Sequence, residues 1–140
     1  MTDRTIKNAS DLDTIDFAKG DGLVPVVAQD AGSGSVLMVA YGNRDALEAT
    51  IETGDMHFWS RSRSALWRKG ETSGNTLTVR SLHSDCDADT ILALVAPTGP
   101  ACHTGEETCF GENGTMSAAA LTLTDLAATL AQRDKERPDG

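Results

Sequence analysis

The sequence predicts a single α+β domain, in which a largely antiparallel or mixed sheet carries one or two flanking helices. Short apolar segments of strand length alternate with glycine-containing turns through the middle of the chain. Only two segments place apolar residues at helical spacing. The length of 140 residues suits one domain, and 39% apolar but only 4% aromatic residues indicate a core of small aliphatic side chains.

The N-terminal part of the chain predicts an arm followed by a hairpin. Residues 1–22 are polar and indicate an irregular N-terminal arm. Residues 23–28 and 35–41 each favour a strand, and residues 30–34 between them have the composition of a turn. Pro25 has no amide hydrogen to donate, so its strand lies at a sheet edge or carries the proline near one end.

A helix and three strands are expected next. Asn43 is a good N-cap residue, and Gly54 suits the left-handed conformation that ends many helices. The three strands are predicted at residues 56–67, 76–82 and 90–96. The last of them is apolar throughout, so we expect it to be buried on both faces.

The C-terminal part of the chain predicts a second helix that begins at Thr124. We therefore expect residues 23–131 to form the single domain and residues 132–140 to form a solvated tail. The last residues are rich in charge and end in a Pro-Asp-Gly sequence, which does not favour regular structure.

The composition excludes several classes of protein. No apolar run is long enough to cross a membrane, and the first residues lack the apolar core of a secretory signal, so we expect a cytoplasmic protein. Three cysteines are an odd number, which argues against a disulfide framework. A formal net charge of −9 disfavours nucleic acid and anionic membranes as partners, although a local basic pocket can still bind a small anionic molecule.

The cysteines Cys86, Cys102 and Cys109 are candidate zinc ligands. They form no C-x-x-C pair, which excludes a zinc ribbon or finger. Three thiolates without a fourth ligand suit an open site whose last position holds water. The alternative is that the cysteines are small buried hydrophobic residues, although Cys102 and Cys109 stand among polar neighbours.

Three aspartates surround the first cysteine. In an extended chain Asp85, Asp87 and Asp89 point to one face and Cys86 points to the other. Three carboxylates on one face repel one another unless a hard cation such as Mg²⁺ lies among them. The alternative is an acidic loop with solvated carboxylates. The glycine and closing glutamate of an EF-hand are missing.

Residues 56–70 contain no acidic side chain and carry a cluster of arginine and lysine together with both tryptophans. A guanidinium pairs well with phosphate because it donates two parallel hydrogen bonds, and hydroxyl and backbone groups in a tight turn add donors. The candidates for substrate binding are Arg61, Arg63, Lys69, Thr72, Ser73 and Asn75. The alternative is a basic edge strand that resists aggregation.

His103 follows a candidate zinc ligand in a polar loop. A neutral imidazole can accept a proton near pH 7, so His103 is a candidate general base. A base is useful here because three thiolates weaken the ability of zinc to acidify water. The alternative is a structural histidine.

These motifs together resemble the phosphoribosyl-AMP cyclohydrolase family of histidine biosynthesis. The resemblance covers residues from about 23 to 110 and rests on Ser60-Arg-Ser-Arg with Leu66-Trp-Arg-Lys-Gly-Glu-Thr-Ser-Gly-Asn, on Asp85-Cys-Asp-Ala-Asp, and on Cys102-His-Thr-Gly followed by Cys109-Phe. Thr108 stands where this family usually has serine. Because the chain ends at Gly140, we expect no pyrophosphohydrolase domain of the kind fused to this one in some relatives.

The resemblance implies the third step of histidine biosynthesis, in which zinc-activated water opens the N1–C6 bond of the adenine ring in 1-(5-phosphoribosyl)-AMP. The implied product is the formimino aminoimidazole carboxamide ribotide. The implied cofactors are Zn²⁺ on Cys86, Cys102 and Cys109 and Mg²⁺ on Asp85, Asp87 and Asp89. The resemblance also implies an intertwined, obligate homodimer whose zinc ligands come from both subunits, and a small-molecule nucleotide as the partner.

The sequence also allows two other functions. One is a noncatalytic nucleotide-binding module with a structural zinc, which would need a fourth protein ligand. The other is a zinc deaminase that releases ammonia, but the H-x-E and P-C-x-x-C signature of that class is absent.

Overall fold

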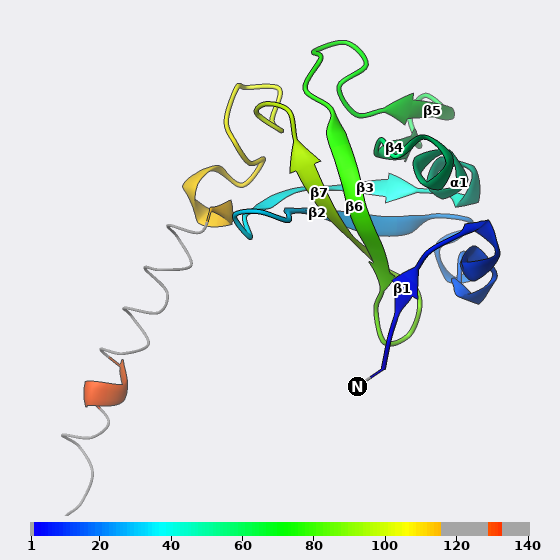
Figure 1. Ribbon diagram of the computed structural model, residues 1–140, viewed down its shortest axis with the longest axis horizontal. Coiled ribbons are helices and arrows are strands. Elements are labelled where there is room, and N and C mark those ends of the chain that lie inside the picture. Colours follow the sequence, from blue (N-terminus) through cyan, green and yellow to red (C-terminus); the bar gives the residue numbers. More distant parts are fainter. Residues whose placement is uncertain (1, 116–128, 133–140) are drawn as a thin grey trace, which may run out of the picture.

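The computed structural model describes residues 2–115 and 129–132, which contain a mixed sheet, a two-stranded sheet and the α-helix α1 (Figure 1). The strands are β1 (Thr5–Ile6), β2 (Val24–Asp30), β3 (Val36–Gly42), β4 (His57–Ser60), β5 (Ala65–Arg68), β6 (Leu77–Ser84) and β7 (Ile91–Pro97). The helices are α1 (Arg44–Thr53) and the short 3-10 turns η1 (Ala9–Thr14), η2 (Ala18–Gly20) and η3 (Gly111–Gly114). This architecture confirms the predicted α+β fold with a mixed sheet.

The main sheet has the strand order β1-β6-β7-β2-β3. β2 and β3 form the predicted antiparallel hairpin, β6 and β7 form another, and β2 joins them by pairing in parallel with β7. Pro25 is the second residue of β2, which agrees with a proline near a strand end rather than an edge strand. The single parallel pairing makes the sheet mixed.

One face of this sheet forms the core. The alternate residues Val24, Val26 and Ala28 of β2 and Ile91, Ala93 and Val95 of β7 are fully buried. They belong to the same core cluster as Leu47 of α1, Leu12 of η1 and Phe58 of β4, so these elements cover that face. Burial of this apolar area is the main contribution to stability.

The other residues of β7, Leu92 and Leu94 among them, are only partly buried. The prediction that this strand is buried on both faces is therefore wrong for the described chain. Its apolar residues alternate between a covered face and a face that the described elements leave partly exposed. A continuous apolar run cannot distinguish these two situations.

Two other elements differ from the sequence-based expectation. Residues 2–22 of the predicted arm 1–22 are not irregular throughout, because β1 pairs with β6 and the side chains of Leu12 and Ile15 are buried. Residues 56–67 form a hairpin of β4 and β5 rather than one strand, since the chain reverses at residues 61–64 and Ser64 adopts a positive φ of 46°.

The helix α1 has the predicted ends. The side chain of Asn43 accepts a hydrogen bond from the amide of Ala46 at 2.8 Å, and Gly54 ends the helix with a φ of 80°. Of the second predicted helix, residues 129–132 are helical, and the remainder from Thr124 lies outside the described residues, as does the predicted tail beyond residue 132. No described helix is long and apolar enough to cross a membrane.

Candidate functional site

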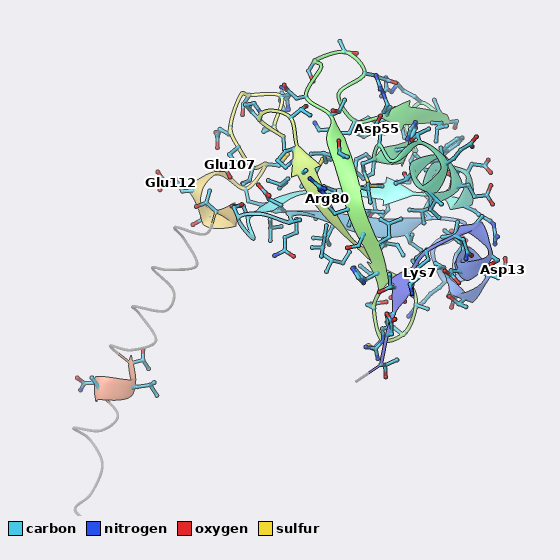
Figure 2. The ribbon with its side chains drawn as sticks, in the orientation of Figure 1. Lys7, Asp13, Asp55, Arg80, Glu107 and Glu112 are labelled. Atoms are coloured by element: carbon cyan, nitrogen blue, oxygen red, sulfur yellow. The ribbon has the colours of Figure 1, made fainter. Side chains whose placement is uncertain are left out.

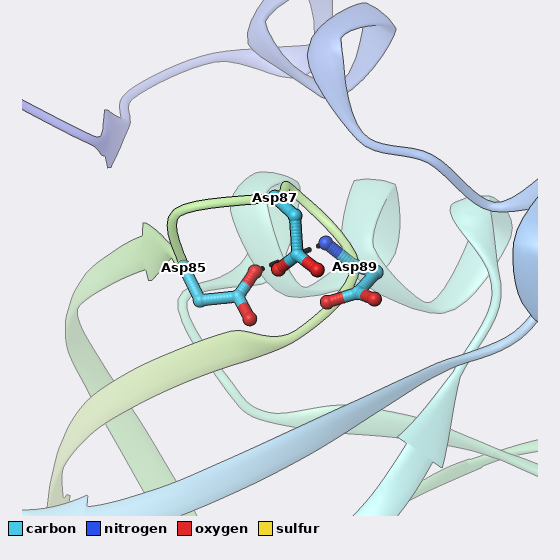
Figure 3. A group of neighbouring side chains, drawn as sticks. All are labelled: Asp85, Asp87 and Asp89. Carbon is cyan, nitrogen blue, oxygen red and sulfur yellow. Dashed lines mark hydrogen bonds between the residues drawn. The ribbon is translucent and has the colours of Figure 1, made fainter.

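The three aspartates lie in the loop that joins β6 to β7, and their carboxylates converge (Figure 3). One oxygen of each carboxylate lies within 4.8 Å of the others. The sequence-based expectation placed the aspartates on one face of an extended chain. The loop is instead a turn, in which Ala88 has a φ of 59°. The Asp85 carboxylate holds the turn by accepting hydrogen bonds from the amides of Asp89 at 3.0 Å and Thr90 at 3.2 Å.

Lys19, which the sequence analysis did not assign to this site, neutralises part of the negative charge of the loop. Lys19 in η2 lies 3.3 Å from a carboxylate oxygen of Asp87 and 2.6 Å from one of Asp89. The amide of Asp16 also donates a hydrogen bond to the Ala88 carbonyl at 2.7 Å. The ion pairs raise the pKa of Lys19, and the hydrogen bond from Lys19 lowers the pKa of Asp89. No local pattern links these positions in sequence.

Cys102 and Cys109 lie on a loop beyond the C-terminal end of β7. We call residues 101–109 the cysteine loop. The amides of Ala101 and Cys102 donate to the carbonyls of Glu107 and Glu106, which closes the loop, and the amide of Cys109 donates to the Leu37 carbonyl of β3 at 2.7 Å. The two cysteines are therefore held at a defined place beside the main sheet.

The two thiols of this loop interact and differ in environment. The hydroxyl of Thr104 donates to the Cys102 sulfur at 3.1 Å and lowers the pKa of that thiol. Burial raises the pKa of Cys109, with a further contribution from the neighbouring Cys102. The thiolate is the form that binds a metal ion, so of the two thiols Cys102 is the better prepared to bind one.

Cys86 lies at the opposite end of β7. The seven residues of this strand separate it from the cysteine loop, and at about 3.3 Å per residue the two ends are about 20 Å apart. Figure 2 agrees with this separation. Glu107 of the cysteine loop lies across the molecule from Lys7, the residue that follows β1. β1 pairs with the end of β6 that leads to Cys86. One copy of the chain does not bring the three thiols together.

Residues 56–70, which we call the basic segment, line two neighbouring cavities. The larger has a volume of about 690 Å³, and the smaller of about 190 Å³. The larger is lined by Val39, Ala40, Tyr41, Trp59, Ser60, Arg61, Ser62, Arg63 and Trp67. The smaller is lined by Arg63, Trp67, Arg68, Lys69, Gly70, Glu71, Thr72 and Ser73. The two therefore share Arg63 and Trp67.

The predicted substrate-binding residues occupy different places around these cavities. The Arg61 guanidinium lies over the Tyr41 ring, 4.5 Å from its centroid. Arg63, Thr72 and Ser73 line the smaller cavity. Lys69 also lines that cavity, but its ammonium donates a hydrogen bond to the Ala101 carbonyl at 2.6 Å. The Asn75 side chain lies against Gly99, in the space that a Cβ at position 99 would occupy.

His103 is exposed at the tip of the cysteine loop, one position from Cys102. Its ring has no hydrogen-bonding partner within the part of the chain that the structure describes. The ring is therefore available to a bound molecule, as a general base requires.

The donor atoms present fit two kinds of metal ion. Carboxylate oxygens suit a hard cation such as Mg²⁺, and the aspartate group is the only set of three or more His, Cys, Asp and Glu side chains within residues 2–115 and 129–132 that is close enough to share one. The Cys102 and Cys109 sulfurs suit Zn²⁺, which needs at least one further protein ligand from elsewhere.

Comparison with known proteins agrees with the motifs at this site. Residues 38–111 match the sequence profile of the phosphoribosyl-AMP cyclohydrolase family. The chain is 59% identical to phosphoribosyl-AMP cyclohydrolase of Clostridium botulinum over 99 residues, which cover 71% of this chain and 90% of that protein. It is 55% identical to the enzyme of the same name from Haloquadratum walsbyi over 111 residues, or 79% of this chain and 84% of that protein.

A longer relative is the histidine biosynthesis bifunctional protein HisIE of Bacillus subtilis. It is 49% identical over 123 residues, which cover 86% of this chain but only 59% of that protein. The matched region includes the basic segment, the cysteine loop and the loop of Asp85, Asp87 and Asp89, which we call the aspartate loop. The chain therefore belongs to the phosphoribosyl-AMP cyclohydrolase family of hydrolases.

Proposed function

We propose that this protein hydrolyses the N1–C6 bond of the adenine ring in 1-(5-phosphoribosyl)-AMP, the third step of histidine biosynthesis. The observation that carries the proposal is the contact between the basic segment and the cysteine loop. The Lys69 side chain lines a cavity with Arg63 and also bonds to Ala101, the residue before Cys102. Groups suited to phosphate and groups suited to zinc therefore lie side by side.

The substrate carries two phosphate groups, and the two cavities that share Arg63 offer two neighbouring places for them. Arg61, Arg63, Thr72 and Ser73 supply the donors, and a guanidinium can hold a phosphate through two parallel hydrogen bonds. The rings of Trp59 and Trp67 in the larger cavity give the purine apolar surfaces against which to stack.

We propose a homodimer in which Cys86 of the partner subunit joins Cys102 and Cys109. The separation of these thiols within one chain supports this arrangement, because a three-thiolate site then requires two chains. The partly exposed row Val39, Val27 and Leu92, which lie opposite one another on β3, β2 and β7, offers an apolar surface for the partner. Zinc bound there would act as a Lewis acid toward a water molecule.

His103 is the proposed general base. It would accept a proton from the water that adds to C6 of the purine. The N1–C6 bond then breaks and C6 becomes the carbon of a carboxamide. One proton of the water passes to N1, and the other completes the amide nitrogen on C6. Asp85, Asp87 and Asp89 would hold Mg²⁺ through carboxylate oxygens. No ammonia leaves in this reaction, which separates it from deamination.

The shared site is tested by combining two defective subunits. Cys86→Ala and Cys102→Ala chains are co-expressed with different affinity tags, and the heterodimer is purified. It should contain one complete site, with Cys86 from one subunit and Cys102 and Cys109 from the other, and one defective site. We expect about half the zinc and half the ring-opening activity of the wild-type dimer.

The homodimers of each variant are the controls and should lack both zinc and activity. A heterodimer without zinc would contradict ligand sharing. Ring opening of phosphoribosyl-AMP is followed by absorbance with and without a chelator, and ammonia is measured in parallel. Ammonia release, or full activity after complete removal of zinc, would contradict the proposed reaction.

A further inference from the structure

Lys69 joins the basic segment to the cysteine loop across 32 positions of sequence. Its ammonium donates to the Ala101 carbonyl at 2.6 Å, and its amide donates to the Met56 carbonyl at 3.0 Å. The side chain therefore projects from a backbone that is fixed next to β5. A hydrogen bond from a charged donor is shorter and stronger than one between neutral groups.

Ala101 is a buried residue that helps to close the cysteine loop. Its side chain is 1% exposed, and its amide donates to the Glu107 carbonyl at 3.2 Å. The next amide, of Cys102, donates to Glu106 at 3.1 Å. The carbonyl that accepts the hydrogen bond from Lys69 thus lies at the base of the loop, directly before Cys102, a proposed zinc ligand.

Two further contacts bind the same segments together. The amide of Thr76 donates to the hydroxyl of Thr98 at 2.8 Å, and the Asn75 side chain lies against Gly99. The turn that follows Lys69 is therefore packed against the chain that enters the cysteine loop. Thr72 and Ser73 of this turn line the smaller cavity, while Asn75 and Thr76 contact the chain that enters the cysteine loop.

We propose that Lys69 is a positioning residue of the zinc site, which holds the cysteine loop in its metal-binding shape, rather than mainly a phosphate ligand. This assignment rests on the proposed function, in which Cys102 and Cys109 bind zinc. It predicts that loss of Lys69 weakens zinc binding before it affects substrate affinity.

The test compares the full-length Lys69→Met, Lys69→Gln and Lys69→Arg dimers with wild type. Zinc affinity is measured by competition with a chromophoric chelator. Changes to groups that support metal ligands typically cost 10–100-fold in affinity, so we expect a loss of about that size for Lys69→Met. Lys69→Arg, which keeps charge and donors, should recover most of the affinity. At saturating zinc the KM of Lys69→Met should rise less than that of Arg63→Ala, because Arg63 lines both cavities.

Lys69→Gln serves if Lys69→Met does not fold, because glutamine keeps a donor without the charge. Lys7→Met is the control for removal of an exposed lysine and should bind zinc as wild type does. Wild-type zinc affinity in both neutral variants, with a raised KM, would overturn the assignment alone. A wild-type protein that binds no zinc would overturn the proposed function and this assignment with it.

Discussion

The ammonium of Lys19 lies 2.6 Å from a carboxylate oxygen of Asp89, so that a residue of the N-terminal segment neutralises part of the aspartate loop. The same ammonium lies 3.3 Å from Asp87. The lysine and a divalent cation would use the same carboxylate oxygens. Two predictions depend on this relationship.

The first prediction concerns acid. The hydrogen bond from Lys19 lowers the pKa of Asp89 from its usual 3.8. The ionised carboxylate therefore stabilises the folded state above the unfolded pKa, and this contribution is lost as pH falls through the lower folded pKa. The difference in urea midpoint between wild type and Asp89→Asn should shrink between about pH 5 and about pH 3. A difference that grows toward low pH would contradict this.

The second prediction concerns magnesium. Removal of the lysine charge by Lys19→Met leaves three carboxylates without their internal counter-ion, so Mg²⁺ should bind severalfold more tightly. Isothermal titration of the purified protein with MgCl₂ measures the affinity. Lys7→Met, in which an exposed lysine outside the loop is lost, is the matched control. Equal affinities in Lys19→Met and wild type would show that Lys19 does not compete with the ion.

The third prediction concerns phosphate binding. Arg63 lines both cavities, so Arg63→Ala should raise KM for phosphoribosyl-AMP more than it lowers kcat, as expected when binding is lost equally from the ground and transition states. Arg80 is exposed on β6 and lines neither cavity, so Arg80→Ala is the control (Figure 2). Steady-state kinetics at saturating zinc measure both constants. An unchanged KM in Arg63→Ala would exclude a role of Arg63 in phosphate binding.

The fourth prediction concerns the contact of Arg61 with Tyr41. A guanidinium over an exposed aromatic ring contributes about 0.5–1 kcal/mol, so Tyr41→Ala should raise KM by about 2- to 5-fold through a less ordered arginine. Tyr41→Phe keeps the ring and should behave nearly as wild type. If both variants raise KM equally, the hydroxyl group and not the ring face is responsible.

The fifth prediction concerns the general base. His103→Ala should keep its zinc, because the exposed imidazole is not among the proposed ligands, while kcat should fall by about 100-fold or more. Metal analysis and the pH profile of kcat are measured on the same preparation. Normal turnover would assign proton transfer to another group or to water. Loss of zinc would point to a ligand role instead.

Local sequence rules predicted the elements whose interactions lie within a few residues. Asn43 and Gly54 correctly marked the ends of α1, because capping involves only the adjacent turn of helix. The hairpin of β2 and β3 followed from two apolar segments and one turn. The reversal at residues 61–64 was missed, because the alternation of arginine and serine there also fits a strand.

The sequence by itself determined the family and the residue types at the site, since its motifs carry donors for zinc, magnesium and phosphate at particular positions. Tertiary structure alone decided which of these donors meet. The direction of β7 places Cys86 at one end of the sheet and Cys102 and Cys109 at the other. The docking of η2 brings Lys19 to Asp89, and the course of the chain after β7 brings Ala101 to Lys69. Such contacts depend on long-range strand pairing, which no short sequence window contains.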